Sequence, residues 1–154
     1  MTRRVLFVCT GNICRSPTAE AVFRDLSQRA AVGVNIEADS AGTHAYHVGS
    51  APDARTVAAA ARRGIDMSQL RARVLEAADF ERFDLLLAMD EQNYRHLQRM
   101  APPDRRNRIH LFMDFAPALD RRDVPDPYYG GETGFEEVLD LVEEAARGLL
   151  AALR

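Results

Sequence analysis

An apolar run that leads through a short turn into an amphipathic helix is the feature that most constrains this fold. Val5-Leu6-Phe7-Val8 has no polar residue, which is typical of a strand buried on both faces of a parallel sheet. Ser16 and Pro17 suit the N-cap and the first position of a following helix. The apolar residues of that helix recur at steps of three and four: Ala19, Val22, Phe23, Leu26 and Ala30. The segment therefore predicts one strand–turn–helix unit of a parallel sheet.

The same alternation continues to the C-terminus. Further strands are predicted at residues 35–39, 83–89 and 108–113, and further helices at residues 52–63, at residues 90–100 and after a loop that spans residues 120–134. The last helix has one apolar face, which consists of Phe135, Val138, Leu139, Val142, Ala146, Leu149 and Leu153. Strands that alternate with helices predict an α/β fold, a doubly wound, four-stranded parallel sheet with helices on both faces.

The chain should form a single domain over residues 1–154. It has no internal repeat, low-complexity tract or linker, and 47% apolar residues are enough for one core. No apolar run approaches the ~20 residues of a membrane helix, and Val5 to Val8 is too short for the core of a signal peptide. We therefore expect a cytoplasmic protein without a membrane partner, in which Cys9 and Cys14 are reduced.

The charged residues exclude several kinds of site. All 20 basic residues are arginine, so a P-loop lysine, a Schiff-base lysine and a Ser–Lys dyad are absent. The arginines are scattered among 23 acidic residues, which argues against nucleic acid as a partner. Two cysteines and four histidines at these spacings do not predict a metal site, although a His44–His47 pair is left open. We expect neither metal nor cofactor.

The loop after the first strand is the candidate site, because doubly wound sheets bind ligands beyond the C-terminal ends of their strands. Cys9-Thr10-Gly11-Asn12-Ile13-Cys14-Arg15-Ser16 connects that strand to the helix. A tight loop at a helix N-terminus directs backbone N–H groups and the positive end of the helix dipole to one point. Gly11 permits backbone conformations that a Cβ atom would block. The loop should therefore bind a dianion.

Cys9 and Arg15 give this loop its expected chemistry. The anion-binding environment favours the thiolate of Cys9. Arg15 can hold two oxygens of a phosphoryl group, and Ser16 is close enough to donate its hydroxyl to the sulfur. The Cys-x5-Arg pair taken alone favours a small buried cysteine at a strand end and a solvated arginine. The strand–loop–helix context favours a nucleophile and a phosphate binder.

These residues resemble the signature of the low-molecular-weight protein tyrosine phosphatases, and the resemblance extends over nearly the whole chain. The further matching segments are Asp39-Ser40-Ala41-Gly42-Thr43, Tyr46-His47-Val48-Gly49 with Asp53 and Arg55, Ala88-Met89-Asp90, and Asp126-Pro127-Tyr128-Tyr129-Gly130. The resemblance implies a metal-independent, two-step hydrolysis of phosphotyrosine in proteins, with a cognate tyrosine kinase as a further partner. Cys9 would be the nucleophile, Arg15 the phosphate binder and Asp126 the general acid and base.

The resemblance also implies supporting roles. The phosphate-binding and loop-supporting residues would be Thr10, Gly11, Asn12, Ile13, Cys14, Ser16 and Ser40. Leu70 stands where the family commonly has a histidine that bonds toward this loop, so either Asn12 has another partner or the loop is held less firmly. The plain alternative for Asp126 is a turn residue, because prolines flank it on both sides.

Aromatic residues indicate the substrate class. Tyr46, Tyr128 and Tyr129 could form a slot for a phenyl ring, although the family often has Trp at the position of Tyr46. The alternative is that these tyrosines only pack within their loops. Cys14 occurs in part of the family as a redox guard, and a Cys9–Cys14 disulfide would protect Cys9. The alternative for Cys14 is an inert core residue.

Two other functions were weighed. Thiol-dependent arsenate reductases use a similar loop but need a further cysteine, and none follows Cys14. A phosphotyrosine-binding module without activity would need the anion-binding loop and Arg15, but would have no need of Asp126. The combination of Cys9, Arg15 and Asp126 favours the hydrolase.

Overall fold

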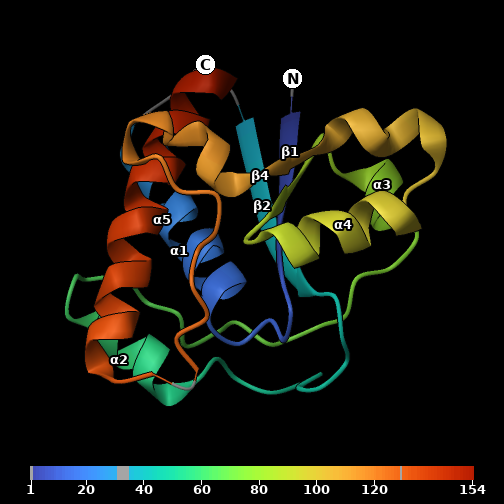
Figure 1. Cartoon of the computed structure of the whole chain (residues 1–154). Coiled ribbons are helices and arrows are strands. Elements are labelled where there is room, and N and C mark those ends of the chain that lie inside the picture. Colours follow the sequence, from blue (N-terminus) through green and yellow to red (C-terminus); the bar gives the residue numbers. More distant parts are fainter. Residues whose placement is uncertain (1, 31–34, 129) are drawn as a thin grey trace.

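Four parallel strands form the central sheet of the computed structural model, which describes residues 2–30, 35–128 and 130–154 (Figure 1). The strands are β1 (Thr2–Cys9), β2 (Asn35–Gly42), β3 (Leu85–Ala88) and β4 (Ile109–Leu111), in the order β2-β1-β3-β4. The chain passes from β1 to one neighbour, β2, and then crosses to the other neighbour, β3. The direction of winding therefore changes beside β1, where such sheets bind ligands.

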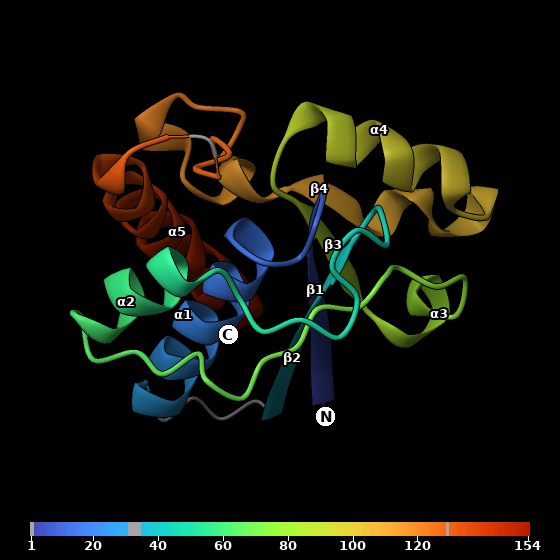
Figure 2. The ribbon, with the colours of Figure 1, turned by 90° about the horizontal axis from the view of Figure 1, so that it is seen from below.

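Helices cover both faces of the sheet (Figures 1 and 2). One face carries α1 (Arg15–Arg29), α2 (Ala54–Ala61) and α5 (Glu132–Leu153). The other face carries α3 (Asp79–Arg82) and α4 (Glu91–Met100). Three short 3-10 helices flank β4 and follow it: η1 (Pro103–Arg108), η2 (Phe112–Phe115) and η3 (Pro117–Leu119). The predicted fold class is confirmed.

The apolar run of β1 divides its side chains between two cores. Val5 and Phe7 lie in the core shared with α1 and α5, whereas Leu6 and Val8 lie in the core beneath α4. All four side chains are fully buried. The continuous apolar pattern thus arises because successive residues of a strand point to opposite faces and both faces are covered.

The longest helix, α5, packs against α1 with the predicted apolar face. All seven residues named for this face are buried. Gly148 of α5 lies so close to the backbone of η2 that a Cβ atom would be 1.8 Å from the carbonyl oxygen of Phe115. Among the residues that the structure describes, no helix is long and apolar enough to span a membrane.

Several predicted boundaries are wrong. The strand predicted at 108–113 ends at Leu111, because Phe112 to Phe115 forms a 3-10 turn that buries Phe112. The loop predicted at 120–134 is too long, since α5 begins at Glu132. The four-residue helix α3 was not predicted, and its only apolar residue, Phe80, gives no periodic signal.

The C-terminal ends of the strands face the lower edge of the molecule in Figure 1. The segments that follow β1 and β2 run along this edge, and the segment between η3 and α5 descends to it past α1 (Figure 1). The backbone confirms this meeting, because Thr43 N donates to Cys9 O and Val124 N donates to Met89 O. Residues distant in sequence therefore surround the loop after β1.

Candidate active site

The loop after β1 is shaped by Asn12 rather than by Gly11. Asn12 has a φ of 58°, in the left-handed region that asparagine tolerates better than most residues. The φ of Gly11 is not positive, so its expected conformational role is wrong. Glycine is needed there for space, because a Cβ atom at position 11 would lie 3.0 Å from Cδ2 of His47.

Backbone donors of this loop are available to an anion. Within the described ranges, the N–H groups of Gly11, Ile13, Cys14 and Arg15 have no protein acceptor, while Asn12 N donates to Cys9 Sγ at 3.3 Å. Helix α1 begins at Arg15, and no side chain caps its N-terminus. Unpaired N–H groups at a helix start, next to a sulfur, form a site for an anion.

The sulfur of Cys9 is buried at the base of the loop, 3.0 Å from the hydroxyl of Ser16. This is the contact that the sequence predicted. The prediction that Ser16 is the N-cap is wrong, because the cap is Cys14 and Ser16 lies inside the first turn. The Ser16 hydroxyl instead contacts Cys9 and accepts from Asn12 Nδ2 at 2.8 Å, so it is not available to the helix amides.

Asn12 joins the loop to three other segments. Its Nδ2 donates to Ser40 Oγ at 3.0 Å as well as to Ser16, and its Oδ1 accepts from the backbone N–H of Arg73 at 3.0 Å. Asn12 therefore has another partner in place of the family's histidine. Leu70 packs partly buried against the core instead.

Glu20 extends this network and was missed by the sequence analysis. Its side chain is 3% exposed, accepts from Ser40 Oγ at 2.7 Å and forms a 2.7 Å ion pair with Arg24. Burial raises the pKa of Glu20 above its ordinary value. A carboxylate one turn after Ser16, between two alanines of an otherwise apolar face, was the available signal.

Arg15 is held from both sides of its guanidinium. Its side chain is 4% exposed, and Nη1 donates to Asp90 Oδ2 at 2.6 Å and to Val124 O at 3.2 Å. The other nitrogen, Nη2, donates to Thr10 Oγ1 at 3.4 Å. Asp90 is thus a positioning residue for Arg15, a role the sequence analysis did not assign. The solvated alternative for Arg15 is wrong.

Asp126 faces the same pocket as Cys9 and Arg15. This pocket has a volume of about 220 Å³, and its lining includes Cys9, Arg15, Asp126, Tyr46 and Tyr128. Asp126 Oδ2 lies 3.8 Å from Arg15 Nη2, and its side chain is about half exposed. Its Oδ1 accepts from Tyr128 N at 3.1 Å. A carboxylate in this position can exchange protons with a group bound in the pocket.

The tyrosines predicted at the site differ in their exposure and in their ring contacts. Tyr46 is 69% exposed and stacks on His44 with ring centroids 5.0 Å apart. Tyr128 lies 6.3 Å from the His47 ring and beneath the Arg55 guanidinium, 5.5 Å from its carbon. Tyr129, the third predicted tyrosine, lies outside the described residues.

Arg55 connects α2 to the segment that carries Asp126. It donates to both oxygens of Asp53, at 3.0 and 2.9 Å, and to the carbonyl of Tyr128 at 3.0 Å. Its guanidinium also lies 4.8 Å from the centroid of Phe135. Asp53 in turn caps α2. The segment that carries Asp126 is therefore anchored at Arg55 as well as at Val124.

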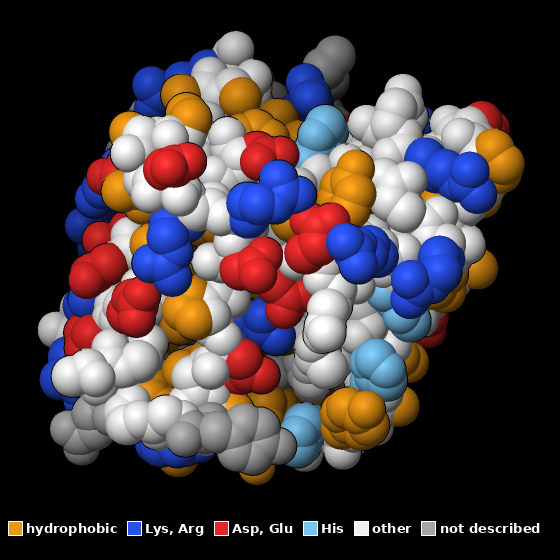
Figure 3. Space-filling view, in the orientation of Figure 1, with side chains coloured by type: hydrophobic (Ala, Val, Ile, Leu, Met, Phe, Trp, Pro, Cys, Tyr) orange, Lys and Arg blue, Asp and Glu red, His pale blue; other side chains and the backbone are white. Residues whose placement is uncertain are grey.

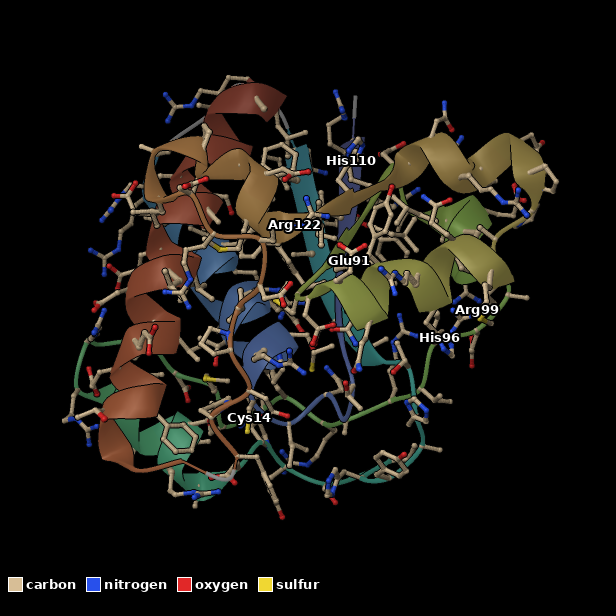
Figure 4. The ribbon with its side chains drawn as sticks, in the orientation of Figure 1. Cys14, Glu91, His96, Arg99, His110 and Arg122 are labelled. Carbon is tan, nitrogen blue, oxygen red and sulfur yellow. The ribbon has the colours of Figure 1, made fainter. Side chains whose placement is uncertain are left out.

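Cys14 is buried at the start of α1, where Figure 4 labels it. Burial raises the pKa of its thiol to about 12, so it is protonated at neutral pH. Both cysteines are free thiols. Over residues 2–30, 35–128 and 130–154, no three His, Cys, Asp or Glu side chains are grouped to hold a metal ion.

Comparison with known proteins decides the family. The model of the low molecular weight phosphotyrosine protein phosphatases matches residues 4–154. The chain belongs to this family. The low molecular weight protein-tyrosine-phosphatase of Streptomyces coelicolor is 50% identical, over 100% of this chain and 95% of its own length. A putative member from Synechocystis is 45% identical, over 97% of this chain and 96% of its own.

The solved structures agree with this family assignment. A crystal structure of a protein tyrosine phosphatase from Entamoeba histolytica superposes with a TM-score of 0.94 at 40% identity. It covers 98% of this chain, which covers 96% of that one. The chain is therefore an enzyme of a hydrolase family, the low molecular weight protein tyrosine phosphatases. Phosphoproteins are the substrates that this membership implies.

Proposed function

We propose that this phosphatase hydrolyses phosphotyrosine in proteins through a cysteinyl-phosphate intermediate, with Cys9 as nucleophile. One observation carries the proposal: Cys9, Arg15 and Asp126 line a single pocket whose floor is a loop with unpaired backbone N–H groups. A dianionic phosphoryl group in this pocket would meet the amides and the guanidinium of Arg15. Nucleophile, anion binder and proton donor would then surround the same phosphorus atom.

The first step transfers the phosphoryl group to sulfur. The Cys9 thiolate attacks phosphorus while the bond to the tyrosine oxygen breaks, and protonated Asp126 gives its proton to that departing oxygen. The loop amides and Arg15 stabilise the charge on the equatorial oxygens. The Ser16 hydroxyl, 3.0 Å from the sulfur, stabilises the thiolate before attack.

The second step regenerates the enzyme. Asp126, now a carboxylate, removes a proton from water, and the resulting oxygen attacks phosphorus as the sulfur departs as thiolate. Phosphate leaves, and Asp126 is again protonated. Both steps use the same residues in exchanged roles and call for no metal ion, so we expect hydrolysis to persist in EDTA.

The pocket supports an aryl phosphate as the substrate class. Tyr46 and Tyr128 line it, and aromatic walls favour a phenyl ring over an aliphatic chain. Thr10, Gly11, Ile13 and Cys14 would bind the phosphate, with Asn12, Ser16 and Ser40 as supports. A single domain over residues 1–154 would act on products of a tyrosine kinase, in the cytosol, where thiols are kept reduced.

Three proteins test this mechanism: the native enzyme, Cys9→Ser and Asp126→Asn. The substrates are aryl phosphates with good and poor leaving groups, and matched phosphotyrosine and phosphoserine peptides. We expect Cys9→Ser to lose turnover but retain binding of the phosphotyrosine peptide. Asp126→Asn should lose about 10²–10⁴-fold in kcat, most with the poor leaving groups.

The leaving-group dependence distinguishes the proposed roles from general damage. A uniform loss in Asp126→Asn for all leaving groups would show that Asp126 does not donate the proton. Turnover by Cys9→Ser would exclude the cysteinyl-phosphate. Equal rates for phosphoserine and phosphotyrosine peptides would exclude the aromatic pocket as the basis of selection, and loss of hydrolysis in EDTA that a divalent ion restores would overturn the metal-free mechanism.

A further inference from the structure

A second cavity of about 370 Å³ adjoins the active-site pocket and is lined by basic side chains. Its lining includes His44 from the segment after β2, and Arg95, His96 and Arg99 from α4. Among the described residues that line it there is no carboxylate, in a chain with 23 acidic residues. Figure 3 shows histidine and arginine side chains gathered on this side of the molecule, and Figure 4 places His96 and Arg99 together on α4.

The positive charge of this cavity is not neutralised from within. In the part of the chain that the structure describes, Arg99 forms no ion pair or hydrogen bond. Arg95 forms only a 3.4 Å pair with Glu91, at 68% exposure, and Glu91 is shared with Arg122. The pKa of His96 is lowered by burial, with His44 and Arg99 adding to the effect. An added negative charge would relieve this repulsion.

Asn93 also lines this cavity, and the hydrogen bonding of its side-chain amide is incomplete. It is 2% exposed, and its Nδ2 donates to Thr10 Oγ1 at 3.2 Å. Its Oδ1 is buried and has no hydrogen-bond partner among the described residues. Buried polar atoms are nearly always paired, so this unpaired acceptor indicates a missing donor, such as an N–H group of a bound peptide.

The cavity borders the catalytic pocket. Thr10 lines both of them. Tyr46, which lines the catalytic pocket, stacks on His44 at 5.0 Å, and the His44 ring lies 5.8 Å from the His96 ring. The three rings therefore span at most about 11 Å, which an extended peptide crosses in about three residues.

We propose that this cavity is a specificity subsite for an acidic group of the substrate, a carboxylate or a second phosphate within about three residues of the phosphotyrosine. The proposal rests on the proposed function, because the phosphotyrosine must occupy the pocket of Cys9. Arg99 and Arg95 would pair with the acidic group, and His44 and His96 would line its path. Binding energy that is gained equally in the bound substrate and in the transition state lowers KM without changing kcat.

The test compares three phosphotyrosine peptides that differ at one flanking position: Glu, Gln or phosphoserine. Each is measured with the native enzyme, Arg99→Gln, Arg99→Lys and Arg29→Gln, and p-nitrophenyl phosphate is measured in parallel. Arg29→Gln is the matched control, because Arg29 is an exposed arginine at the far end of α1, and Asp25 is its ion-pair partner among the described residues.

The native enzyme should prefer the Glu peptide to the Gln peptide by about fivefold in kcat/KM, mostly through KM, and the phosphoserine peptide more strongly. Arg99→Gln should reduce the preference about threefold, Arg99→Lys should retain most of it, and Arg29→Gln should leave it unchanged. Raised ionic strength should weaken it in the native enzyme.

Two results overturn the subsite: equal kcat/KM for all three peptides in the native enzyme, or the same loss of preference in Arg29→Gln as in Arg99→Gln. A preference for phosphoserine alone would restrict the subsite to phosphate and exclude carboxylates. Failure of the proposed function has a different signature, since the native enzyme would then hydrolyse neither p-nitrophenyl phosphate nor any phosphotyrosine peptide.

Discussion

The two carboxylate oxygens of Asp90 accept hydrogen bonds from different partners, one from the start of a helix and one from an arginine. Oδ1 accepts from Asn93 N at 2.8 Å and caps α4, while Oδ2 accepts from Arg15 at 2.6 Å. A helix cap is fixed by the backbone that it terminates, so the position of Arg15 is coupled to the start of α4. The geometry of the Arg15 guanidinium therefore depends on an element on the opposite face of the sheet.

The Asp90→Asn substitution separates the role of Asp90 as a helix cap from its role in holding Arg15. Asparagine caps helices as well as aspartate does, but it cannot form the charged pair with Arg15. We expect roughly a 10–100-fold loss in kcat/KM, weaker inhibition by inorganic phosphate, and nearly native stability. Asp90→Ala should show the same kinetic loss and also unfold more easily, by about 1 kcal/mol in chemical denaturation. Native kinetics in Asp90→Asn would remove Asp90 from the positioning of Arg15.

Cys14 is expected to protect Cys9 from irreversible oxidation. Burial keeps Cys14 protonated, with a pKa of about 12, so peroxide should react first at Cys9 and give a sulfenic acid and water. The Cys14 thiol then displaces the hydroxyl as a second water and forms a disulfide, which added thiol reduces. Native enzyme should regain activity after peroxide and dithiothreitol, whereas Cys14→Ser should not. Full recovery of Cys14→Ser would identify Cys14 as a core residue only.

The geometry of a strand, a loop and a helix places Cys9, Arg15 and Ser16 in one site, whereas Asp126 is assigned to that site by the resemblance to the phosphatase family. Sequence reasoning did not find Glu20, because the link from Glu20 to the loop runs through Ser40 on another strand. The roles of Asp90 and of the backbone of Arg73 were missed for the same reason. Tertiary contacts of this kind leave no periodic signal in a single sequence.

At the scale of elements, α5 and η2 meet at Gly148. Alanine normally stabilises a helix interior relative to glycine by about 1 kcal/mol. Here a Cβ atom would be 1.8 Å from Phe115 O, so Gly148→Ala should instead destabilise the protein by roughly 1–3 kcal/mol or more. Gly134 is the matched control, because a Cβ atom there would be an ordinary 3.5 Å from Pro127.

Urea denaturation of both variants measures the difference. Gly134→Ala should be neutral or more stable by up to about 1 kcal/mol. Stabilisation by both substitutions would show that η2 can move away from α5 without a loss of stability.

The long elements with one apolar face, such as α5, were predicted well, whereas α3 and η2 were not, since three or four residues are too few to reveal a period.

At the scale of the whole molecule, carboxylates with lowered pKa values and carboxylates with raised pKa values change the stability of the fold with pH in opposite directions. Hydrogen bonds from Arg122 to Glu91 and from Arg62 to Glu136 hold the pKa values of these carboxylates below their ordinary range. Such groups stabilise the fold above the ordinary pKa and lose this contribution as pH falls through the lowered value. Glu20 behaves in the opposite way, because burial raises its pKa.

The folded state therefore binds a proton at Glu20 more tightly than the unfolded chain does. Between the ordinary pKa of 4.5 and the raised value, the folded state holds more protons, so the contribution of Glu20 to stability falls as pH rises through this window. Glu20→Gln removes the titrating group and keeps an oxygen that can accept from Ser40.

Unfolding free energies of native protein, Glu20→Gln and Glu91→Gln, measured in urea from pH 4 to pH 7, test the sign. The native protein should lose stability relative to Glu20→Gln as pH rises, because it must bury a charge that glutamine lacks. Relative to Glu91→Gln it should gain, because the ion pair with Arg122 forms only when Glu91 is ionised. Parallel pH slopes for the native protein and Glu20→Gln would mean that the Arg24 ion pair fully compensates the burial of Glu20, and the network beneath the loop would then be insensitive to pH.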